Sequence, residues 1–331
     1  MKSSLIGTAT EMTDQQVITT LEQAPAKLVA FKNEVAKVIV GQNEAVDLII
    51  QSILVGGHSL LIGVPGLAKT LLVTTVSKAL GLDFSRIQFT PDLMPSDITG
   101  TEVLNKERTF DFRRGPVFAN VVLADEINRT PPKTQAALLE AMQEKCVSIG
   151  GISYDLPQPF FVLATQNPIE QEGTYPLPEA QLDRFLFNIA VGYPSKEEEE
   201  QVVKQTTIGH NTGIDQIFTA QEITDVQTAL KRLPVTDDTI DYAVSLVRKT
   251  RPGADGAHSK ADEYLKWGAG PRASQNLILA AKAVSIMQGV GSPTIDHVKA
   301  VSKPILRHRI VVNYKAKAEG LTADHIIETL L

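Results

Sequence analysis

Hydrophobic positions follow one pattern in the first part of the chain and a different one in the second part. In the first part, short apolar runs alternate with helical or turn-rich segments, and these runs read HSLLIG, FSRIQF, NVVLAD, FFVLAT and RFLFNIAV. Runs of this length are typical of strands that are buried on both faces of a parallel sheet. We therefore expect an α/β domain here.

Two helical segments precede the first of these runs. Residues 14–38 show helical apolar spacing, which we expect Pro25 to break. The segment VIVGQNEAVDLIIQSILVGG is amphipathic and ends in Gly56 and Gly57, which predicts a helix followed by a turn.

The pattern changes near residue 194, where helical spacing replaces the strand-like runs. We expect a tail and a helix over residues 1–34, an α/β domain over residues 35–193 and a smaller helical domain over residues 194–331. The four glutamates at positions 197–200 fit an acidic first helical turn, which complements the helix dipole, better than an interaction surface.

Composition narrows the class of protein. The 331 residues are 43% hydrophobic and 21% charged, which is ordinary for a globular chain. No apolar run reaches the roughly 18 to 20 residues of a membrane-spanning helix, so we expect a soluble protein without membrane insertion. The N-terminus lacks the apolar region of a secretory signal, and the single cysteine, Cys146, fits a reducing compartment, so we expect the cytoplasm.

A glycine-rich loop lies between an apolar strand, SLLI, and an apolar helix, LLVTTVSKAL. This order is the one that a phosphate-binding loop requires, although Ala68 replaces the glycine of the pattern G-x-x-x-x-G-K-[ST]. Lys69 would reach the β- and γ-phosphates of ATP, and Thr70 would ligate Mg2+. The expected nucleotide contacts are Gly63, Val64, Pro65, Gly66, Leu67, Ala68, Lys69, Thr70 and Leu71.

The replacement at Ala68 raises the alternative of an inactive site. We expect Ala68 to lie already within the helix that follows, where alanine is the most favourable residue. A single methyl group is then tolerated, and we expect the loop to bind ATP.

Two further apolar runs end in polar residues that suit ATP hydrolysis. The run VVLADEINR ends in Asp125, which can hold Mg2+ through water, and Glu126, which can polarise the attacking water. The run FFVLATQNP ends in Asn167, whose amide can orient that water. The alternative for Asn167 is an asparagine that closes a turn before Pro168.

The order of these motifs resembles that of an AAA+ ATPase, and specifically the MoxR family, whose members carry GVPGLAKT, ADEINR and QNP followed by LPEAQLDRF. The resemblance runs from about residue 35 to the C-terminus. It implies an AAA+ core with a parallel five-stranded sheet, a helix-2 insert, a pre-sensor hairpin and an all-α lid. In this family the alanine is the usual residue at position 68, which supports an active site.

The resemblance also assigns roles to single residues. It makes Glu126 and Asn167 catalytic and Asp125 a metal-site residue. Arg184, in LPEAQLDRF, becomes an arginine finger that acts in trans on a neighbouring subunit, and Arg272, in GAGPRAS, becomes the sensor 2 arginine of the lid.

Each arginine has an alternative. Arg184 can form a structural pair with Asp183, and Arg272 can be an exposed arginine in the first turn of a helix. Arg129, just after the acidic pair, is a second candidate for the arginine that acts in trans.

Three further features follow from the resemblance. The adenine is expected between the α/β domain and the lid, near Ile39, Val40 and Gln42. The segment PSDITGTEVLNKERTFDFRRGPVFAN fits a helix interrupted by a hairpin. The segment CVSIGGISYDL has two glycines between alternating arms, which is a strong signal for a two-residue hairpin turn.

The implied function is an ATP- and Mg2+-dependent ring motor, most often a hexamer, that remodels client proteins together with von Willebrand factor A domain proteins. A nucleic-acid motor of MCM type and the motor subunit of a metal chelatase are the alternatives. A nucleic-acid channel should be strongly basic. The net charge is −6, and acidic residues interrupt the basic cluster Lys106, Arg108, Arg113 and Arg114. We therefore expect a protein client and no nucleic acid.

Overall fold

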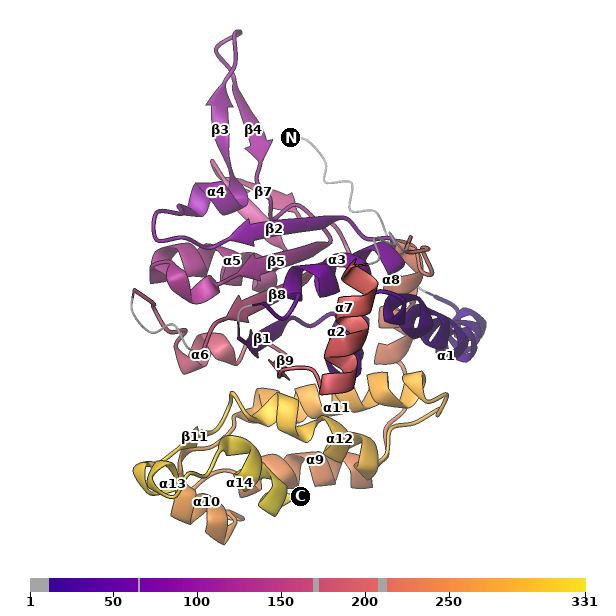
Figure 1. The fold of residues 1–331 in the computed structure, drawn as a ribbon, viewed down its shortest axis with the longest axis vertical. Coiled ribbons are helices and arrows are strands. Elements are labelled where there is room, and N and C mark those ends of the chain that lie inside the picture. Colours follow the sequence, from indigo (N-terminus) through magenta and orange to yellow (C-terminus); the bar gives the residue numbers. More distant parts are fainter. Residues whose placement is uncertain (1–11, 65, 169–172, 208–212) are drawn as a thin grey trace.

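The chain forms a base around a five-stranded sheet and a helical lid that packs against it (Figure 1). The computed structural model describes residues 12–64, 66–168, 173–207 and 213–331. The strands, in their order across the sheet, are β2 (Phe84–Gln88), β5 (Val121–Asp125), β8 (Phe161–Gln166), β1 (Ser59–Gly63) and β9 (Phe187–Val191). All neighbours pair in parallel, so the five apolar runs are confirmed as strands.

Both faces of the sheet are covered at its central strands β5, β8 and β1, which explains why these are mostly apolar, whereas the edge strand β2 alternates apolar and polar residues. Leu61 and Leu163 belong to a core that includes α2, α3 and the lid, whereas Leu60 and Val162 belong to a second core under α5. Successive residues of a strand point to opposite faces, so two covered faces require a continuous apolar run. The helices that precede β9 are α1 (Asp14–Ala36), α2 (Asn43–Val55), α3 (Lys69–Ala79), α4 (Pro95–Thr99), α5 (Pro132–Glu144) and α6 (Glu179–Leu182).

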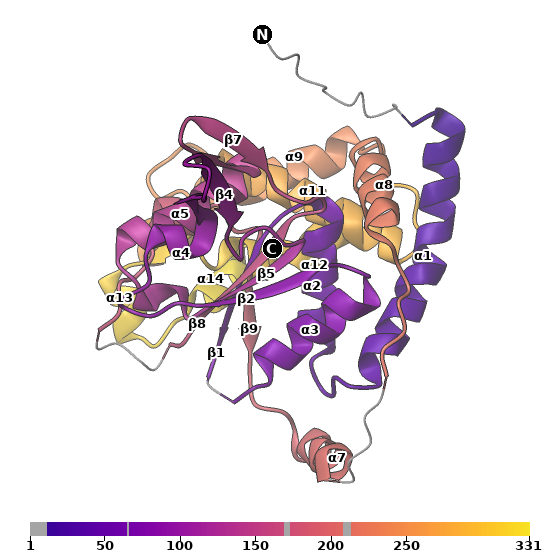
Figure 2. The ribbon, with the colours of Figure 1, turned by 90° about the horizontal axis from the view of Figure 1, so that it is seen from above.

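Pro25 does not break the first helix, so that expectation was wrong. α1 is continuous from Asp14 to Ala36, starts at a capping box formed by Thr13 and Gln16, and runs along one flank of the molecule (Figure 2). Ala24 and Leu28, on either side of the proline, are buried in contacts that α1 makes with the base and the lid. This packing outweighs the one backbone hydrogen bond that proline removes.

Two hairpins rise from the base as expected. The first follows α4 and pairs β3 (Gly100–Leu104) with β4 (Phe110–Arg114), and the second pairs β6 (Cys146–Ile149) with β7 (Ile152–Asp155). Gly150 and Gly151 have φ values of 56° and 81° in the turn of the second hairpin, a conformation that favours glycine. The ring of Phe112 stacks on Tyr154 at a centroid distance of 4.2 Å and joins the two hairpins.

The lid consists of helices and one small sheet that the sequence did not predict. After β9 the helices are α7 (Lys196–Thr207), α8 (Ala220–Lys231), α9 (Asp237–Lys249), α10 (Ser259–Tyr264), α11 (Pro271–Met287), α12 (Ile295–Leu306), α13 (Tyr314–Ala318) and α14 (Ala323–Leu330). β10 (Leu265–Trp267) pairs with β11 (Val311–Val312), and strands this short carry no periodicity in the sequence. The expected acidic first turn is confirmed in α7, which stands apart from the sheet (Figure 2).

The base and the lid share one apolar core. α8 packs on α1 and α2, and α11 packs on α1 and α2 as well. The domain boundary near residue 194 therefore stays a prediction. Within the described residues, no helix combines the length and apolar character that a membrane span needs.

Candidate nucleotide site

A pocket of about 300 Å³ lies at the carboxyl ends of β1, β5 and β8. Strands of a parallel sheet end at a common edge, so motifs far apart in the sequence meet there. The described residues that line the pocket are Gly66, Leu67, Ala68, Lys69, Thr70, Asp125, Glu126, Thr165 and Asn167. Eight of these nine residues were selected from the sequence, and Thr165 is the ninth.

The loop between β1 and α3 forms one wall. A Cβ at Gly63 would lie 2.9 Å from the backbone oxygen of Val191 on β9, so only glycine fits where the loop leaves the sheet. The ammonium group of Lys69 donates to the Gly63 carbonyl. Burial lowers the pKa of Lys69, and the carboxylates of Asp125 and Glu126 oppose that shift. Lys69 is therefore a partly desolvated cation at the position expected to bind phosphate.

Three residues expected to contact the nucleotide are not part of the described pocket lining, namely Val64, Pro65 and Leu71. Val64 is half-buried next to Pro65, which lies outside the described residues. The side chain of Leu71 is 46% exposed on α3. Their contacts with a nucleotide stay predictions.

Ala68 does not lie within α3, so that expectation was wrong. Its φ of 52° and ψ of 30° are left-handed, and it forms the N-cap of the helix. A left-handed residue at this point turns the chain so that the first N–H groups of α3 face the pocket, where they can bind an anion. The glycine at this position in the general motif already indicates a left-handed residue, because glycine adopts positive φ without strain.

We expect Ala68→Gly to raise the free energy of unfolding by about 1 kcal/mol, because it removes the strain of a left-handed alanine. Ala136→Gly is the matched control, since Ala136 is exposed inside α5, where glycine costs about 1 kcal/mol. Urea titrations of both variants test the expectation. If both substitutions destabilise the protein equally, the left-handed conformation of Ala68 is wrong.

Asp125 is held by two side chains that the sequence analysis missed. Its Oδ1 accepts a hydrogen bond of 2.6 Å from the Thr165 hydroxyl, and its Oδ2 accepts one of 2.6 Å from Nη2 of Arg86 on β2. Thr165 is also the acceptor for the backbone N–H of Glu126, at 2.9 Å. Their signals were a hydroxyl near the end of the apolar strand β8 and a charge in the alternating strand β2, both beside the strand that ends in Asp125.

Glu126 has a strained backbone and a held carboxylate. Its φ of 58° and ψ of 48° are left-handed, which is rare outside glycine and concentrates at functional sites. Its Oε2 accepts hydrogen bonds of 3.0 Å from Gln88 and from Nη1 of Arg129. Arg129, the second candidate for a trans-acting arginine, is thus paired with the carboxylate of its own subunit.

Asn167 lies at the end of β8 and is 7% exposed. It lines the same pocket as Glu126 and Lys69. This position suits an amide that orients a water molecule between the two, so its catalytic role remains the interpretation that we favour over a turn residue.

The expected adenine segment contacts the loop. Gln42 donates from Nε2 to the carbonyl of Leu67 at 3.1 Å, while its buried Oε1 has no hydrogen-bond partner within the described structure. Ile39 is buried nearby in the chain, and Val40 is half-buried. The unpaired Oε1 of Gln42 can accept a hydrogen bond from the exocyclic amino group of adenine, and the apolar side chains nearby can contact the adenine ring.

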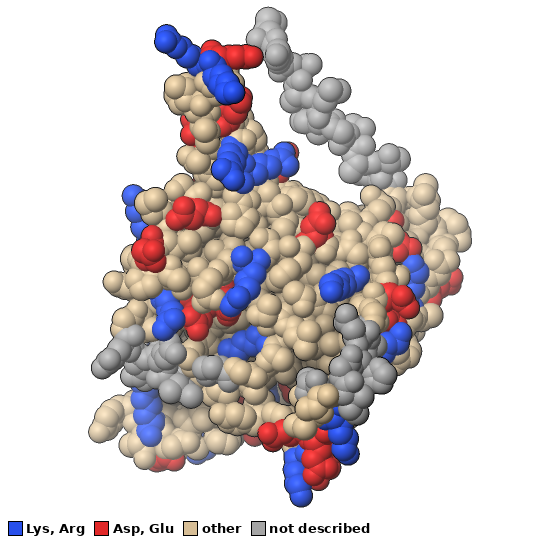
Figure 3. Space-filling view, turned by 45° about the horizontal axis from the view of Figure 1, so that its top comes forward, with Lys and Arg blue, Asp and Glu red and all other residues tan. Residues whose placement is uncertain are grey.

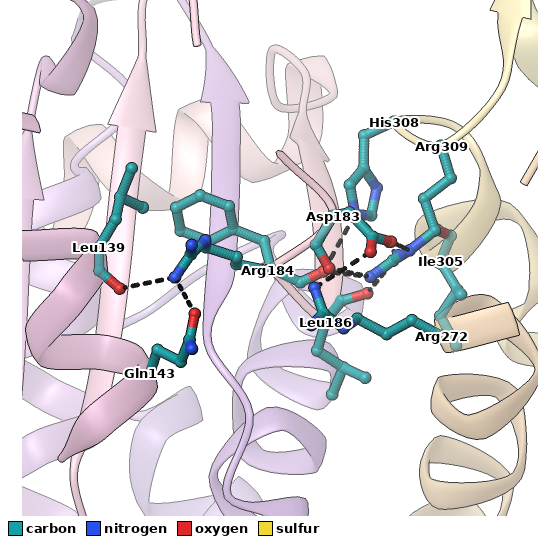
Figure 4. A network of polar contacts seen from close by, with 10 residues as sticks. Leu139, Gln143, Asp183, Arg184, Leu186, Arg272, Ile305, His308 and Arg309 are labelled. Atoms are coloured by element: carbon teal, nitrogen blue, oxygen red, sulfur yellow. Dashed lines mark hydrogen bonds and ion pairs between the residues drawn. The ribbon is translucent and has the colours of Figure 1, made fainter. Parts of the chain in front are cut away.

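The two arginines assigned from the resemblance lie outside the described lining of the pocket, and Figure 4 shows the contacts that each one makes instead. Nη1 of Arg184 donates to the Leu139 carbonyl at 3.3 Å and to the side chain of Gln143, both on α5. Arg272 begins α11 as expected and donates to Oδ2 of Asp183 at 3.1 Å. Asp183 therefore bonds Arg272 and Arg309 of the lid, and among the described residues it does not form the structural pair with Arg184 that was the alternative.

Comparisons with known proteins agree with this geometry. Residues 58–187 match the "ATPase family associated with various cellular activities (AAA)", and residues 257–330 match an AAA lid domain. The chain is 45% identical to "Chaperone MoxR1" of Mycobacterium tuberculosis over 90% of its length and 79% of that protein. It is 41% identical to "Uncharacterized protein YeaC" of Bacillus subtilis over 89% of its length and 90% of that protein.

A solved structure is similar over nearly its whole length. The crystal structure of a candidate ATPase from Cytophaga hutchinsonii has a TM-score of 0.89 and 43% identity, with 96% of each chain covered. A phosphate-loop pocket on a parallel five-stranded sheet, closed by a helical lid, defines the class of AAA+ ATPases. Within that class, the chain belongs to the MoxR family.

Proposed function

We propose that the chain hydrolyses ATP with Mg2+ in this pocket and, as a ring, uses the energy to remodel or mature client protein complexes. The observation that carries the proposal is the meeting of Lys69, Glu126 and Asn167 at one sheet edge. A cation, a carboxylate and an amide there can bind phosphate, activate water and orient it.

The donor atoms fit Mg2+. Thr70 supplies a hydroxyl and Asp125 a carboxylate, and oxygen ligands are the ones that this ion prefers. Because Asp125 already bonds Thr165 and Arg86, we propose that it holds the ion through water. Bound Mg2+ would neutralise charge on the β- and γ-phosphates.

The remaining residues bind ATP or activate the attacking water. Gln42 and the apolar side chains of Ile39 and Val40 hold the adenine, and the backbone N–H groups from residue 63 to residue 71 hold the phosphates. Glu126 takes a proton from the attacking water, with its carboxylate kept in place by Gln88. Asn167 positions that water.

Lys69→Ala is expected to weaken ATP binding by about 10- to 100-fold, because the phosphates lose a charged hydrogen bond. Lys78→Ala is the matched control, since Lys78 is exposed at the other end of the same helix. Equilibrium titration with a fluorescent ATP analogue in the presence of Mg2+ measures both. Unchanged affinity of the Lys69 variant would reject the nucleotide site.

The ring, its partners and its compartment are part of the same proposal. The relative named as a chaperone supports a client-remodelling role, and the family resemblance supports a hexamer and von Willebrand factor A domain partners. A cytoplasmic location is proposed from the single cysteine.

The surface of the inserts favours a protein client over a nucleic acid. On the β3–β4 hairpin, basic residues alternate with Glu102, Glu107 and Asp111, so no continuous basic stripe forms there (Figure 3). Exposed apolar side chains lie on the same hairpin, with Leu104 57% and Phe110 68% exposed. Such a mixed surface suits contact with a polypeptide.

A further inference from the structure

The end of α12 is joined to the segment that carries Arg184 (Figure 4). Three consecutive residues, Arg307, His308 and Arg309, follow this helix and bond to backbone oxygens on residues 183–188. The side chain of Arg309 is only 1% exposed, so the joint is inside the protein.

Arg309 uses every N–H of its guanidinium in this joint. Nη1 also donates to Ile305 of α12, while the other acceptors lie on both sides of Arg184. They are Oδ1 of Asp183 at 2.8 Å, the carbonyl of Asp183 at 3.1 Å, the carbonyl of Phe185 at 2.6 Å and the carbonyl of Leu186 at 3.2 Å. A planar group with five fixed donors therefore binds the backbone around the expected finger to the lid.

The charge states of Arg309 and His308 keep the joint intact at neutral pH. Burial lowers the pKa of Arg309 to about 10, and Asp183 opposes the shift, so Arg309 stays charged at neutral pH. Burial and the neighbouring Arg309 lower the pKa of His308 well below its usual value, so His308 is neutral. Its Nε2 lies 3.0 Å from the Phe185 carbonyl oxygen and 2.8 Å from Nη1 of Arg309. A buried charge that lost Asp183 would be strongly unfavourable.

Asp183 also connects this joint to Arg272. Its Oδ1 binds the buried Arg309, whereas its Oδ2 binds Arg272, which is 51% exposed. The exposed bond can exchange when the lid moves, because water can replace it. The buried bond cannot exchange without opening the core.

We propose that Arg309 is a positioning residue that makes the finger Arg184 move with the lid of its own subunit. The inference rests on the proposed ring, in which Arg184 completes the pocket of the adjacent subunit. Nucleotide-dependent displacement of the lid then acts through Arg309 on the backbone of residues 183–186, against the contacts that hold this segment to the base, which are the Arg184 side chain on α5 and the Leu186 N–H on the His58 carbonyl. The state of one pocket reaches the next through Arg309. A catalytic group must be placed closely, since a displacement of about 1 Å can cost about 10² in rate.

Arg309→Lys tests the inference. Lysine keeps the charge and can reach Asp183, but its single ammonium cannot span the carbonyls on both sides of Arg184. We expect kcat for ATP to fall by about 10²-fold and KM to change by less than about 3-fold, because the pocket of the same subunit is intact. Arg248→Lys is the matched control, since Arg248 is exposed and bonds Asp255 outside the joint; its kcat should stay close to that of the unmodified protein.

Mixed rings separate positioning from a general structural defect. Arg309→Lys subunits mixed with Lys69→Ala subunits should regain turnover, because the second protein supplies a correctly held finger. Arg309→Lys mixed with Arg184→Ala should stay low. If Arg309→Lys fails to fold, as judged by circular dichroism, Arg309→Gln replaces it in the same mixtures, because a neutral amide leaves no unpaired charge in the joint and Asp183 keeps its bond to Arg272.

Two results overturn the inference and leave the proposed function standing. One is a kcat of Arg309→Lys equal to that of the unmodified protein. The other is a lost activity that Lys69→Ala subunits do not restore, although the same subunits restore Arg184→Ala. If Lys69→Ala subunits restore neither variant in rings shown to be mixed, the trans-acting finger of the proposed function has failed, and the inference fails with it.

Discussion

Replacing Arg184 by alanine is expected to lower ATP turnover by about 10³- to 10⁵-fold, with ATP binding retained. Among the described residues that line the pocket, Lys69 is the cation, and phosphoryl transfer needs further positive charge on the departing phosphate. Arg184 is bonded to α5, outside this lining, and in the proposed ring it would serve a neighbouring subunit in a head-to-tail contact. Its planar, permanently charged group can bind two phosphate oxygens.

The decisive measurement mixes two inactive proteins, Arg184→Ala and Lys69→Ala. Subunits of the first kind keep an intact loop and should regain turnover beside a neighbour of the second kind, which still carries Arg184. Arg248→Ala is the control for loss of a surface arginine, because Arg248 is exposed and bonds Asp255. The shared pocket is wrong if the mixture stays inactive although mixed rings form, or if Arg184→Ala alone keeps its activity.

Arg129 offers a direct comparison in the same assay. It pairs with Glu126 of its own subunit, so a defect of Arg129→Ala should stay in that subunit and should not be restored by Lys69→Ala neighbours. Restoration of Arg129→Ala, together with full activity of Arg184→Ala, would make Arg129 the finger.

Glu126→Gln is expected to lower turnover by about 10²- to 10⁴-fold while ATP still binds, because a neutral amide cannot take a proton from water. The amide keeps the size of the side chain and can still accept a hydrogen bond from Arg129, so the pocket should keep its shape. Glu140→Gln is the matched control, since Glu140 is exposed on α5. Turnover and equilibrium ATP binding are measured side by side.

Near-normal turnover of Glu126→Gln would move the general base to another residue. If turnover is lost as expected, the same variant holds ATP and should retain its client. Affinity purification of this variant with ATP then tests the remodelling role, and a purified client would show which class of protein contacts the insert hairpins.

Local patterns were sufficient for the sheet and for most of the pocket. Apolar runs predicted the five strands because both sheet faces are covered, and the Gly150-Gly151 turn predicted its hairpin because few residues adopt the required positive φ. The loop and the acidic pair at Asp125 were also visible, since their chemistry depends on residues adjacent in the chain and on the ends of predicted strands.

Other features depend on residues that folding brings together. Pro25 is tolerated because α1 packs along the lid, and a period in the sequence does not contain that packing. Ala68 is left-handed at the N-cap of α3, against the preference of alanine for a helix. In both cases the folded structure overrides a local preference, which for a proline inside a helix is about 3 kcal/mol.

The hydrogen-bond and ion-pair partners of charged residues were the hardest features to predict from the sequence. Arg86 binds Asp125 from a neighbouring strand, and Arg309 binds Asp183 although 126 residues separate them. A buried charge must find an opposite charge and enough acceptors, but many acidic residues along the chain could satisfy that need equally well. Folding selects one of them, because close packing leaves a single acceptor set within reach of each buried donor.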